Sequence, residues 1–574
     1  MARRRGWRLL LLLAAGGAAW WGWRSWQRLN TLPEVAAFTP APESTPLATE
    51  VVRLPDAGRE PTVAEQLEQR LAALAASFER RRRHQPPAGL VRFDVEGLSA
   101  EITAVLDNVG DDAQVSVHIR DLRTGHVLFD DYGDVPLNPA SNQKLLTSAA
   151  ALELLGPDYS FSTRVALDAS TIYLVGEGDP TLQVDDLREL AIAAAPAIDA
   201  GGITRLVFDD SAFSPEGLAP GYDAQGPGLA YEPESAALSV GYNVVEITVT
   251  PQPRERTVAV AVRPQAPSIV VDNRARLGKR RALAITTAAR GDDTIVSVRG
   301  TLPRRGPPVV ERRRLHDPGR VAASLFAAAL AEQSATMPLR PERGVVPPNA
   351  EVLVEHESPP LMEILDRGMA YSNNFIAEQV LRTLAWRSTG EPGNWAAGDD
   401  ILLGYWSALG RDPDEIVVEN GSGLSRVGRL TSAGLVDLIA LANRGSGPGR
   451  ALLEVLPVAG EPGTMHSRLR LSGKRVRAKT GTLDDVSGLT GVITSEDATP
   501  VVAFSILINA RDTARLGAPL RREIEDRIVT ATLFALDDYE ARVSGLGDAS
   551  AAAATAARPR GPSPAAADAA PARP

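Results

Sequence analysis

The amino-acid sequence predicts a mixed α/β fold in which a mostly antiparallel sheet lies between helices and is interrupted by a β-rich insertion. The stretch from residue 138 to 156 repeats leucine and alanine at helical spacing and ends at Gly156, a residue that favours a helix stop. Residues 157–355 instead carry short alternating runs punctuated by Pro and Gly, the pattern of strands rather than of packed helices. Residues 500–509 are almost all apolar, which suits a strand buried on both faces.

The other elements follow in chain order. Two alternating runs around a Thr124–Gly125 turn predict a hairpin that leads into the 138–156 helix. Apolar residues on one face predict a helix over 62–83, upstream of the hairpin. Further strands are predicted at 206–210, 245–249, 257–262, 294–298, 475–479, 486–494 and 500–509, and further helices at 360–386, 430–443 and 519–535.

Composition excludes several classes of site and partner. The 574 residues carry a formal charge of −10, which argues against nucleic acid as the main partner. The chain has no cysteine, so it can form neither a disulfide nor a thiolate metal site. The six histidines are scattered without metal-ligand spacing, and no H-E-x-x-H motif occurs. We therefore expect neither a metal nor another cofactor.

The N-terminus predicts export. Four arginines at positions 3, 4, 5 and 8 precede an uncharged run over 9–23, as in a secretory signal. Tryptophans at 20, 21, 23 and 26 resemble an interfacial aromatic belt, which favours an uncleaved membrane anchor. Cleavage after Ala19 is the competing outcome. In both cases the bulk of the chain is predicted to lie outside the cytoplasm, in the periplasm or its equivalent.

The first candidate site residues are Ser141 and Lys144, at the start of the 138–156 helix. Three residues are almost one helical turn, so the two side chains lie on one face. A serine in the first helical turn, next to an amine, can be a nucleophile with its own base. Taken alone, S-x-x-K is a weak signal and is better explained as a helix cap followed by a solvated lysine.

Two downstream motifs favour a catalytic role for Ser141 and Lys144. Ser372 and Asn374 form S-x-N within AYSNNFIAE, and Lys479, Thr480 and Gly481 form K-T-G at the end of a predicted strand. Each motif is common by chance. Together, in this order, S-x-x-K, S-x-N and K-T-G are typical of penicillin-binding proteins and class A β-lactamases.

Beyond these motifs, the chain resembles the D-alanyl-D-alanine carboxypeptidase/endopeptidase family of low-molecular-mass class C penicillin-binding proteins, peptidase family S13. The resemblance covers about residues 113–536 and includes the blocks GEGDPTL (176–182), ENGSGLSR (419–426) and LPVAGEPGTMHSRL (456–469). About 230 residues separate Ser141 from Ser372, an insertion typical of this family. The resemblance implies an α/β (α+β) serine β-lactamase/penicillin-binding-protein-like catalytic domain, its antiparallel sheet flanked by helices, with nested β-rich inserted domains.

The resemblance also implies catalytic roles. Ser141 attacks the carbonyl of the penultimate D-Ala, and Lys144 takes the hydroxyl proton if its pKa is depressed. Ser372 relays a proton towards the leaving amine, and Asn374 orients Lys144 or the substrate amide. A second register, with Tyr371 and Asn373 as Y-x-N, is the class C β-lactamase pattern. The long insertion favours S-x-N.

The same resemblance assigns the substrate-binding residues. Lys479 supplies positive charge near the terminal carboxylate, and Thr480 offers that carboxylate a hydroxyl. Gly481 gives backbone room for substrate along the strand edge. The backbone N–H groups of Ser141 and Thr482 form the oxyanion hole.

The expected function is that of a penicillin-inhibited serine D-Ala-D-Ala carboxypeptidase acting on peptidoglycan stem peptides, with D,D-endopeptidase action as a second activity. A β-lactamase or esterase of the same fold and a catalytically silent wall-binding scaffold are the alternatives. The expected partners are stem peptides, β-lactams as covalent inhibitors and, through the N-terminal segment, the membrane. The expected division is a signal or anchor at 1–29, a linker and helix at 30–90, a discontinuous catalytic domain at 91–165 and 356–540, inserted β-rich domains at 166–355, and a disordered tail at 541–574.

Overall fold

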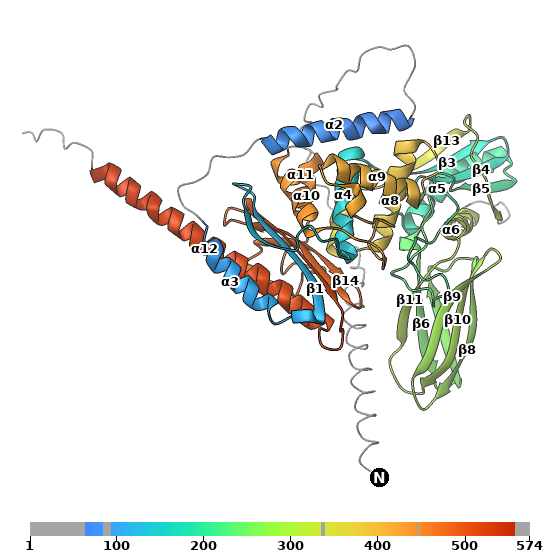
Figure 1. Ribbon diagram of the computed structural model, residues 1–574. Coiled ribbons are helices and arrows are strands. Elements are labelled where there is room, and N and C mark those ends of the chain that lie inside the picture. The colour runs from blue at the N-terminus through green and yellow to red at the C-terminus, as the bar shows by residue number, and fades with distance from the viewer. Residues whose placement is uncertain (1–62, 84–92, 334–338, 446–447, 557–574) are drawn as a thin grey trace, which may run out of the picture.

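The computed structural model describes residues 63–83, 93–333, 339–445 and 448–556, and it is built around an antiparallel five-stranded sheet (Figure 1). The strand order is β14-β15-β16-β1-β2, so β14 lies at one edge. Every residue of β15 is buried, as are the first nine of β16, which confirms the two-sided burial predicted for residues 500–509. The strands are β1 (Ala113–Asp121), β2 (Val127–Asp131), β14 (Val476–Thr482), β15 (Val486–Thr494) and β16 (Pro500–Ala510).

Helices cover both faces of this sheet. On one face α3 (Val95–Leu106) and α12 (Ala518–Ala556) pack against each other and against the strands. On the other face α10 (Ser432–Arg444) contacts β16, β1 and β15. The fold class predicted from the sequence is confirmed.

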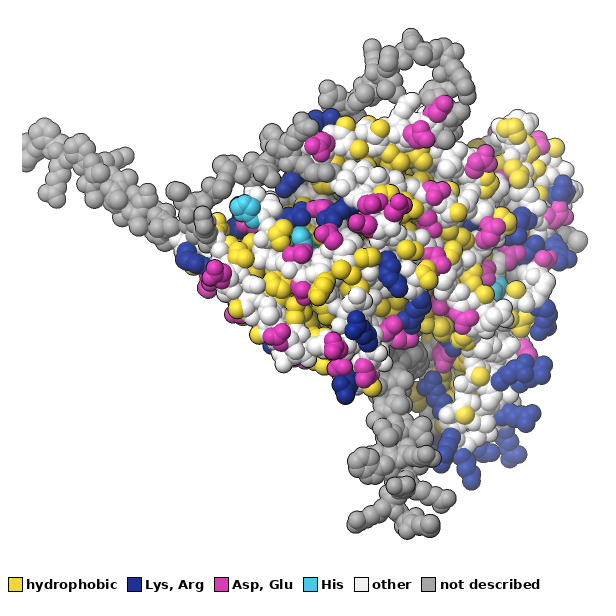
Figure 2. Space-filling model, viewed as in Figure 1, with side chains coloured by type: hydrophobic (Ala, Val, Ile, Leu, Met, Phe, Trp, Pro, Cys, Tyr) yellow, Lys and Arg dark blue, Asp and Glu magenta, His cyan; other side chains and the backbone are white. Residues whose placement is uncertain are grey.

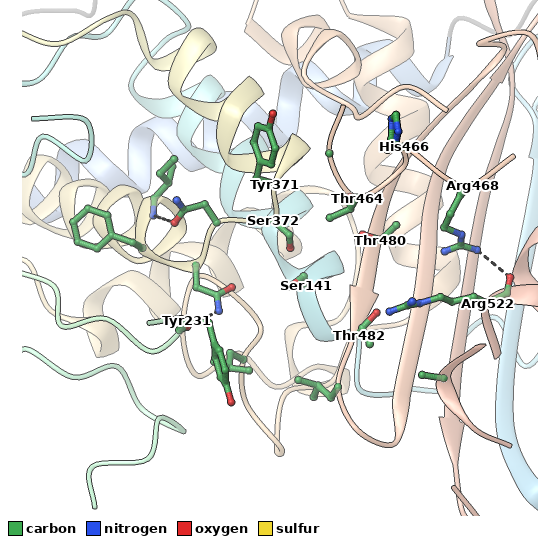
Figure 3. A pocket seen from close by; sticks show the side chains of 18 of the residues that line it. Ser141, Tyr231, Tyr371, Ser372, Thr464, His466, Arg468, Thr480, Thr482 and Arg522 are labelled. Carbon is green, nitrogen blue, oxygen red and sulfur yellow. Dashed lines mark hydrogen bonds between the residues drawn. The ribbon is translucent and has the colours of Figure 1, made fainter. Parts of the chain in front are cut away.

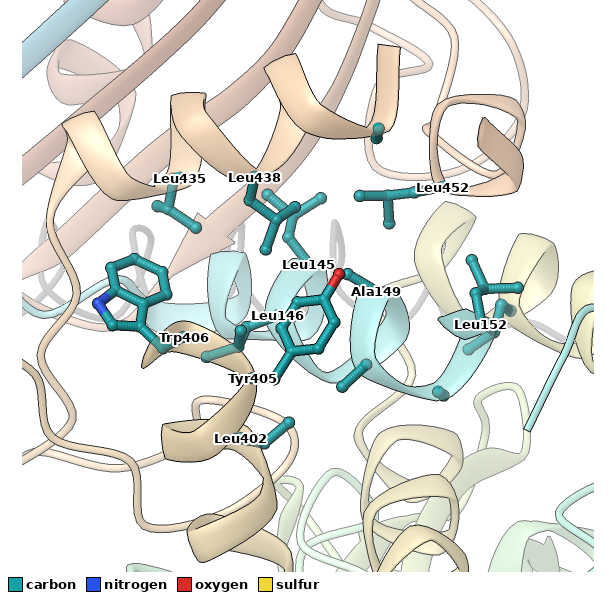
Figure 4. Close-up of a cluster of buried hydrophobic side chains, with 14 of the residues drawn as sticks. Leu145, Leu146, Ala149, Leu152, Leu402, Tyr405, Trp406, Leu435, Leu438 and Leu452 are labelled. Atoms are coloured by element: carbon teal, nitrogen blue, oxygen red, sulfur yellow. The ribbon is translucent and has the colours of Figure 1, made fainter. Parts of the chain in front are cut away.

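Helix α4 (Gln143–Leu154) is the hub of the helical layer. Ten consecutive residues, 143–152, are buried, so the helix is enclosed on all sides. Figure 4 shows its leucines and Ala149 packed against side chains of three neighbouring helices. The helices of this layer are α2 (Val63–Arg83), α7 (Leu361–Ala370), α8 (Asn374–Thr389), α9 (Trp395–Ala408), α10 and α11 (Pro448–Glu454). This enclosed helix fixes the position of the turn before it, where Ser141 lies.

The insertion between α4 and α7 holds two further bodies that share one hydrophobic core. The first is a mixed sheet ordered β12-β5-β4-β3-β13, with two helices packed together on it. Its elements are β3 (Ser162–Asp168), β4 (Thr171–Gly176), α5 (Val184–Gly201), β5 (Arg205–Asp209), α6 (Pro318–Gln333), β12 (Pro341–Arg343) and β13 (Glu351–Glu357). The prediction of strands without helical packing over 157–355 is therefore wrong, because Leu187, Leu190, Ala191 and Ala194 of α5 form a helical stripe within an Ala- and Pro-rich segment.

The second body is a β-sandwich of two three-stranded sheets, ordered β11-β6-β7 and β8-β10-β9. It projects away from the helices of the first body (Figure 1). Its strands are β6 (Val244–Gln252), β7 (Thr257–Arg263), β8 (Ile269–Gly278), β9 (Ala282–Arg290), β10 (Asp293–Pro303) and β11 (Val309–Arg314).

Two other predicted helices differ from the structure. The helix predicted over 360–386 breaks at residues 371–373, between α7 and α8. The last helix runs to Ala556, so the predicted disordered tail of 541–574 is wrong for residues 541–556, since alanine is the best helix former. The remainder of that tail, the 1–29 segment and residues 30–62 of the predicted linker lie outside the described residues.

Among the described residues, no helix is both long enough and apolar enough to span a bilayer. The described elements are completed by short 3-10 turns: η1 (Gly110–Asp112), η2 (Ala140–Asn142), η3 (Gly241–Asn243), η4 (Pro413–Glu415) and η5 (Arg470–Ser472).

Candidate active site

Ser141 lies in η2, a tight turn that leads directly into α4, rather than in the first turn of the α-helix. We call residues 139–142 the nucleophile turn. Its backbone is strained, because Ala140 has φ +45° in the left-handed region. Two hydrogen bonds hold it: the Ala140 N–H donates to Asn138 Oδ1 at 2.9 Å, and Asn142 Nδ2 donates to the Pro139 carbonyl at 3.0 Å. The turn therefore presents Ser141 from a fixed backbone.

At the start of α4, the Lys144 side-chain nitrogen contacts three oxygens from different parts of the chain. Its Nζ lies 3.0 Å from Ser141 Oγ, 2.7 Å from Asn374 Oδ1 and 2.8 Å from the Ser422 carbonyl oxygen. An amide oxygen and a backbone carbonyl oxygen can only accept hydrogen bonds. A neutral amine has two N–H donors for these two acceptors, and its lone pair is then directed at the Ser141 hydroxyl.

Burial makes the neutral amine accessible near neutral pH. Lys144 is 2% exposed, and burial lowers its pKa from 10.5 to about 7. The nearby Glu378 carboxylate opposes this shift. Lys144 thus has the proton affinity that a general base needs.

The second motif forms at the break between α7 and α8. Ser372 occupies the left-handed region with φ +54°, which interrupts the helical course of the chain. Asn373 caps α8 by accepting a hydrogen bond from the Ile376 N–H, and Asn374 reaches Lys144. The geometry favours the S-x-N register over the register that uses Tyr371 and Asn373.

Lys479 of β14 joins the second motif to the third. Its Nζ lies 2.8 Å from Ser372 Oγ and 2.6 Å from the Thr480 carbonyl oxygen. Lys479 is fully buried, and burial holds its pKa well below the usual value, with the Lys144 charge adding to that effect. The side chains thus form two hydrogen-bonded groups: Lys144 with Ser141 and Asn374, and Lys479 with Ser372.

Gly481 lets the edge strand approach the nucleophile turn. A Cβ at Gly481 would lie 2.7 Å from both Asn142 Nδ2 and the Pro139 carbonyl oxygen. A Cβ at its cross-strand partner Gly488 would lie closer still to Asn142 Nδ2, at 2.3 Å. Close packing of β14 on the turn thus requires a glycine here, in addition to the room for substrate that the sequence predicts.

The outer edge of β14 faces the site. The Ala478 N–H on that edge donates to the Pro457 carbonyl oxygen, so alternation directs the N–H groups of Thr480 and Thr482 to the same side. Figure 3 shows Ser141 between Ser372 and Tyr231 on one side and the two threonines on the other. The eight predicted site residues thus come together around Ser141, and five of them line one cleft: Ser141, Ser372, Asn374, Thr480 and Thr482.

Comparison with known proteins gives the family. The sequence profile of the D-Ala-D-Ala carboxypeptidase 3 (S13) family matches residues 98–532. A D-alanyl-D-alanine carboxypeptidase of Actinomadura sp. (strain R39) is 35% identical over 444 residues, which cover 72% of this chain and 81% of that protein. The chain belongs to the D-Ala-D-Ala carboxypeptidase S13 family. It is a serine-type D-Ala-D-Ala carboxypeptidase, as the motifs predicted.

A second relative agrees with the S13 assignment, and a solved structure agrees with the fold. The carboxypeptidase DacB of Mycolicibacterium smegmatis is 28% identical over 463 residues, 75% of this chain and 86% of that protein. The crystal structure of penicillin-binding protein 4 from Haemophilus influenzae superposes with a TM-score of 0.63 at 22% identity, covering 74% of this chain and 97% of that one. This second similarity supports the fold.

The S13 site also contains a loop whose role the motifs did not reveal, residues 420–423. Its Ser422 carbonyl accepts from Lys144, and a Cβ at Gly423 would lie 2.0 Å from the Ala140 carbonyl oxygen. Buried Glu378 holds the loop by accepting from the N–H groups of Gly421 and Ser422, both at 3.0 Å. The block ENGSGLSR marked the loop in the sequence, whereas no local pattern marked Glu378.

The cleft of this S13 peptidase extends from Ser141 to the insertion. The Tyr231 carbonyl oxygen accepts from Asn374 Nδ2 at 2.8 Å, which ties the insertion to the second motif. The base of the sandwich, at Val244 and Arg263, also lines the cleft. On the opposite side Arg522 of α12 points into the cleft towards Thr482 (Figure 3). Among the described residues, no cluster of three His, Asp or Glu side chains could hold a metal ion.

Proposed function

We propose that Ser141 and Lys144 are the nucleophile and general base of this S13 carboxypeptidase. The observation that carries the proposal is the Lys144 amine, 3.0 Å from Ser141 Oγ, with its other two contacts made to obligate acceptors. Lys144 takes the hydroxyl proton as Ser141 Oγ bonds to the carbonyl carbon of the penultimate D-Ala. The C–N bond then breaks, and water later hydrolyses the ester on Ser141.

The second motif handles the leaving group and the alignment of the base. Ser372, held by Lys479, passes a proton to the departing D-Ala amine. Asn374 accepts from Lys144 and so fixes the direction of its lone pair. Removal of the Ser372 hydroxyl should slow acylation, because the leaving amine would depart without a proton.

The edge of β14 binds the rest of the substrate. The Lys479 Nζ and the Thr480 hydroxyl donate hydrogen bonds to the terminal carboxylate, and Arg522 adds positive charge to this part of the cleft. The N–H groups of Ser141 and Thr482 stabilise the tetrahedral oxyanion. Gly481 contributes by letting β14 come close enough for Thr482 to serve with Ser141.

The substrate class is the peptidoglycan stem peptide that ends in D-Ala-D-Ala, and β-lactams acylate Ser141 in its place. The D-alanyl-D-alanine carboxypeptidase of Actinomadura supports the first part, and a β-lactam complex of the Haemophilus influenzae penicillin-binding protein 4 supports the second. Cleavage of D-Ala cross-links, the endopeptidase reaction, uses the same steps and stays a prediction.

Extracytoplasmic action follows from the substrate, and we propose that residues 1–29 export the chain and anchor it to the membrane. The arginines before the apolar run and the tryptophans after it support this proposal. N-terminal sequencing of protein from its host distinguishes the anchor from cleavage: a mature chain starting near Trp20 would contradict anchoring but not export.

The test of catalysis uses a soluble chain and purified muropeptides, with released D-Ala measured by mass spectrometry. Ser141→Ala should abolish release while the protein stays folded. Ser467→Ala is the matched control, because this exposed serine lines the same cleft without contacting the lysines. D-Ala release by folded Ser141→Ala would refute the assignment. Rapid loss of a penicilloyl adduct without D-Ala release would indicate a β-lactamase.

A further inference from the structure

The β-sandwich of the insertion has a charge opposite to that of the whole protein. Residues 244–315 contain fifteen Lys and Arg against six Asp and Glu, a net charge of +9 in a chain whose net charge is −10. Figure 2 shows these basic side chains gathered over the end of the sandwich that points away from the other domains. Such a concentration of one sign of charge favours an anionic partner.

Topology brings three basic turns to this end. Strands β8 and β10 are parallel and end together, Gly278 opposite Pro303, so the turns that follow them are neighbours. Strand β11 starts at Val309 beside Val249 of β6, which places the β6–β7 turn at the same end. We call these turns, residues 253–256, 279–281 and 304–308, the basic tip. It carries seven cations and one anion: Arg254, Glu255, Arg256, Lys279, Arg280, Arg281, Arg304 and Arg305.

The basic charge continues from the tip along the outer face of the sandwich. Arg274 of β8 and Arg299 of β10 are paired in register, both exposed, and share Asp272 as their ion-pair partner. Arg276 lies two residues closer to the tip on the same face of β8. Within the described part of the chain, Arg276 has no acidic partner. The same holds for six of the seven tip cations: Arg254, Arg256, Lys279, Arg280, Arg304 and Arg305. The tip cations, Arg276 and the Arg274–Arg299 pair, whose two charges share one aspartate, form a basic track that runs over the tip and along the strands.

The shape and composition of this track indicate the kind of partner. Residues 244–315 contain no Phe, Trp or Tyr, so the sandwich has neither a stacking platform for nucleobases nor aromatic residues to enter a bilayer. A flat lipid surface would contact the tip alone, whereas a linear polymer can contact both the tip and the outer face. A linear polyanion therefore fits the track better than a membrane or a nucleic acid does.

We propose that the basic tip and the adjoining outer face bind the peptidoglycan polymer itself, through its carboxylates, as a site separate from the active site. The proposal rests on the proposed function, because stem peptides with free carboxylates make each peptidoglycan strand a linear polyanion. The base of β6 lines the catalytic cleft, and nine residues of strand place the tip about 30 Å away. One strand of polymer can thus occupy the tip while a stem peptide of the same polymer enters the cleft.

The test measures binding and turnover separately. Binding of Ser141→Ala protein to insoluble peptidoglycan is measured by sedimentation at increasing salt, with and without charge reversal at the tip. The tip variant carries R280E, R304E and R305E. The control carries R188E, R470E and R542E, which make the same change in net charge at exposed arginines outside the sandwich. The tip variant should bind on the order of 100-fold more weakly, at roughly fivefold for each cation removed. The control should bind like the unreversed protein.

Turnover provides the second readout. With active Ser141, the tip variant should show a raised KM on insoluble peptidoglycan, an unchanged kcat, and unchanged kcat/KM on a short soluble muropeptide. Equal binding by the tip variant and the control would overturn the proposal. So would tip-dependent binding to phosphatidylglycerol vesicles without binding to peptidoglycan, which would indicate a membrane partner. Failure of muropeptide turnover would instead refute the proposed function, since the binding measurement does not need an active enzyme.

Discussion

The pH dependence of acylation depends on the environment of Lys144. Burial lowers the pKa of this amine to about 7, and only the neutral amine can accept the Ser141 proton. Burial disfavours the charged form of the Lys144 amine. Acylation is therefore lost as the pH falls through the lowered pKa, because the amine becomes protonated, and it is gained as the pH rises. The rate constant for acylation by a fluorescent penicillin should follow the neutral fraction of Lys144.

The structure gives the size of the change. With a pKa of about 7, roughly one tenth of Lys144 is neutral at pH 6 and roughly nine tenths at pH 8, so the rate should rise about tenfold over this range and then level off. An amine with the ordinary pKa of 10.5 would give about a hundredfold rise over the same two pH units and no plateau until pH 11. Stopped-flow fluorescence from pH 5.5 to 9.5 separates these two curves.

A variant identifies the titrating group, because buried Lys479 also has a lowered pKa. The Glu378 carboxylate raises the pKa of Lys144 but does not contribute to that of Lys479. Glu378→Gln should therefore move the inflection to lower pH. Lys144→Arg should show almost no acylation at any pH, since guanidinium stays protonated. An inflection that Glu378→Gln leaves in place, or a rate that still climbs at pH 9.5, would refute the assignment of Lys144 as the base.

Three further variants test the geometry around the site. Gly423→Ala should slow acylation by tenfold or more, because its Cβ would lie 2.0 Å from a carbonyl oxygen of the nucleophile turn. Gly473→Ala, also at positive φ but in open space, should acylate normally. Equal acylation rates for the two variants would contradict the close approach of the two turns. Ser372→Ala should acylate far more slowly than Tyr371→Phe in the same fluorescent-penicillin assay, and the reverse order would establish the Y-x-N register. Leu146→Ala should lower the free energy of unfolding by about 2–5 kcal/mol in urea titration, since it opens a cavity in the fully buried hub, and a loss below about 1 kcal/mol would show that α4 is not the hub.

The sequence predicted the sheet, the hub helix and the motif residues because each depends on local periodicity or on a short pattern. The strands predicted at 475–479, 486–494 and 500–509 correspond to β14, β15 and β16, and the 138–156 helix corresponds to α4 with its preceding turn. These segments bury regular apolar faces, so their own spacing determines their structure.

What the sequence did not predict depends on contacts between distant segments. The apolar spacing of residues 360–386 continues through the break at Ser372, which is stabilised by Lys479, over a hundred residues away. Glu378 resembles an ordinary helical glutamate until the 420–423 loop folds over it and donates two N–H groups. The Ala-rich segment after residue 540 was predicted to be disordered because its composition resembles that of linkers, although alanine also favours helix.

The most direct test of the account is to locate the covalent adduct after treatment with benzylpenicillin. Cleavage after Arg123 and Lys144 releases the peptide of residues 124–144, in which Ser141 is the only serine. Intact mass should show one penicilloyl group per chain, and fragmentation should place it on Ser141, with no adduct in folded Ser141→Ala protein. An adduct on any other residue, or stoichiometric labelling of the Ser141→Ala variant, would contradict the assignment of the nucleophile.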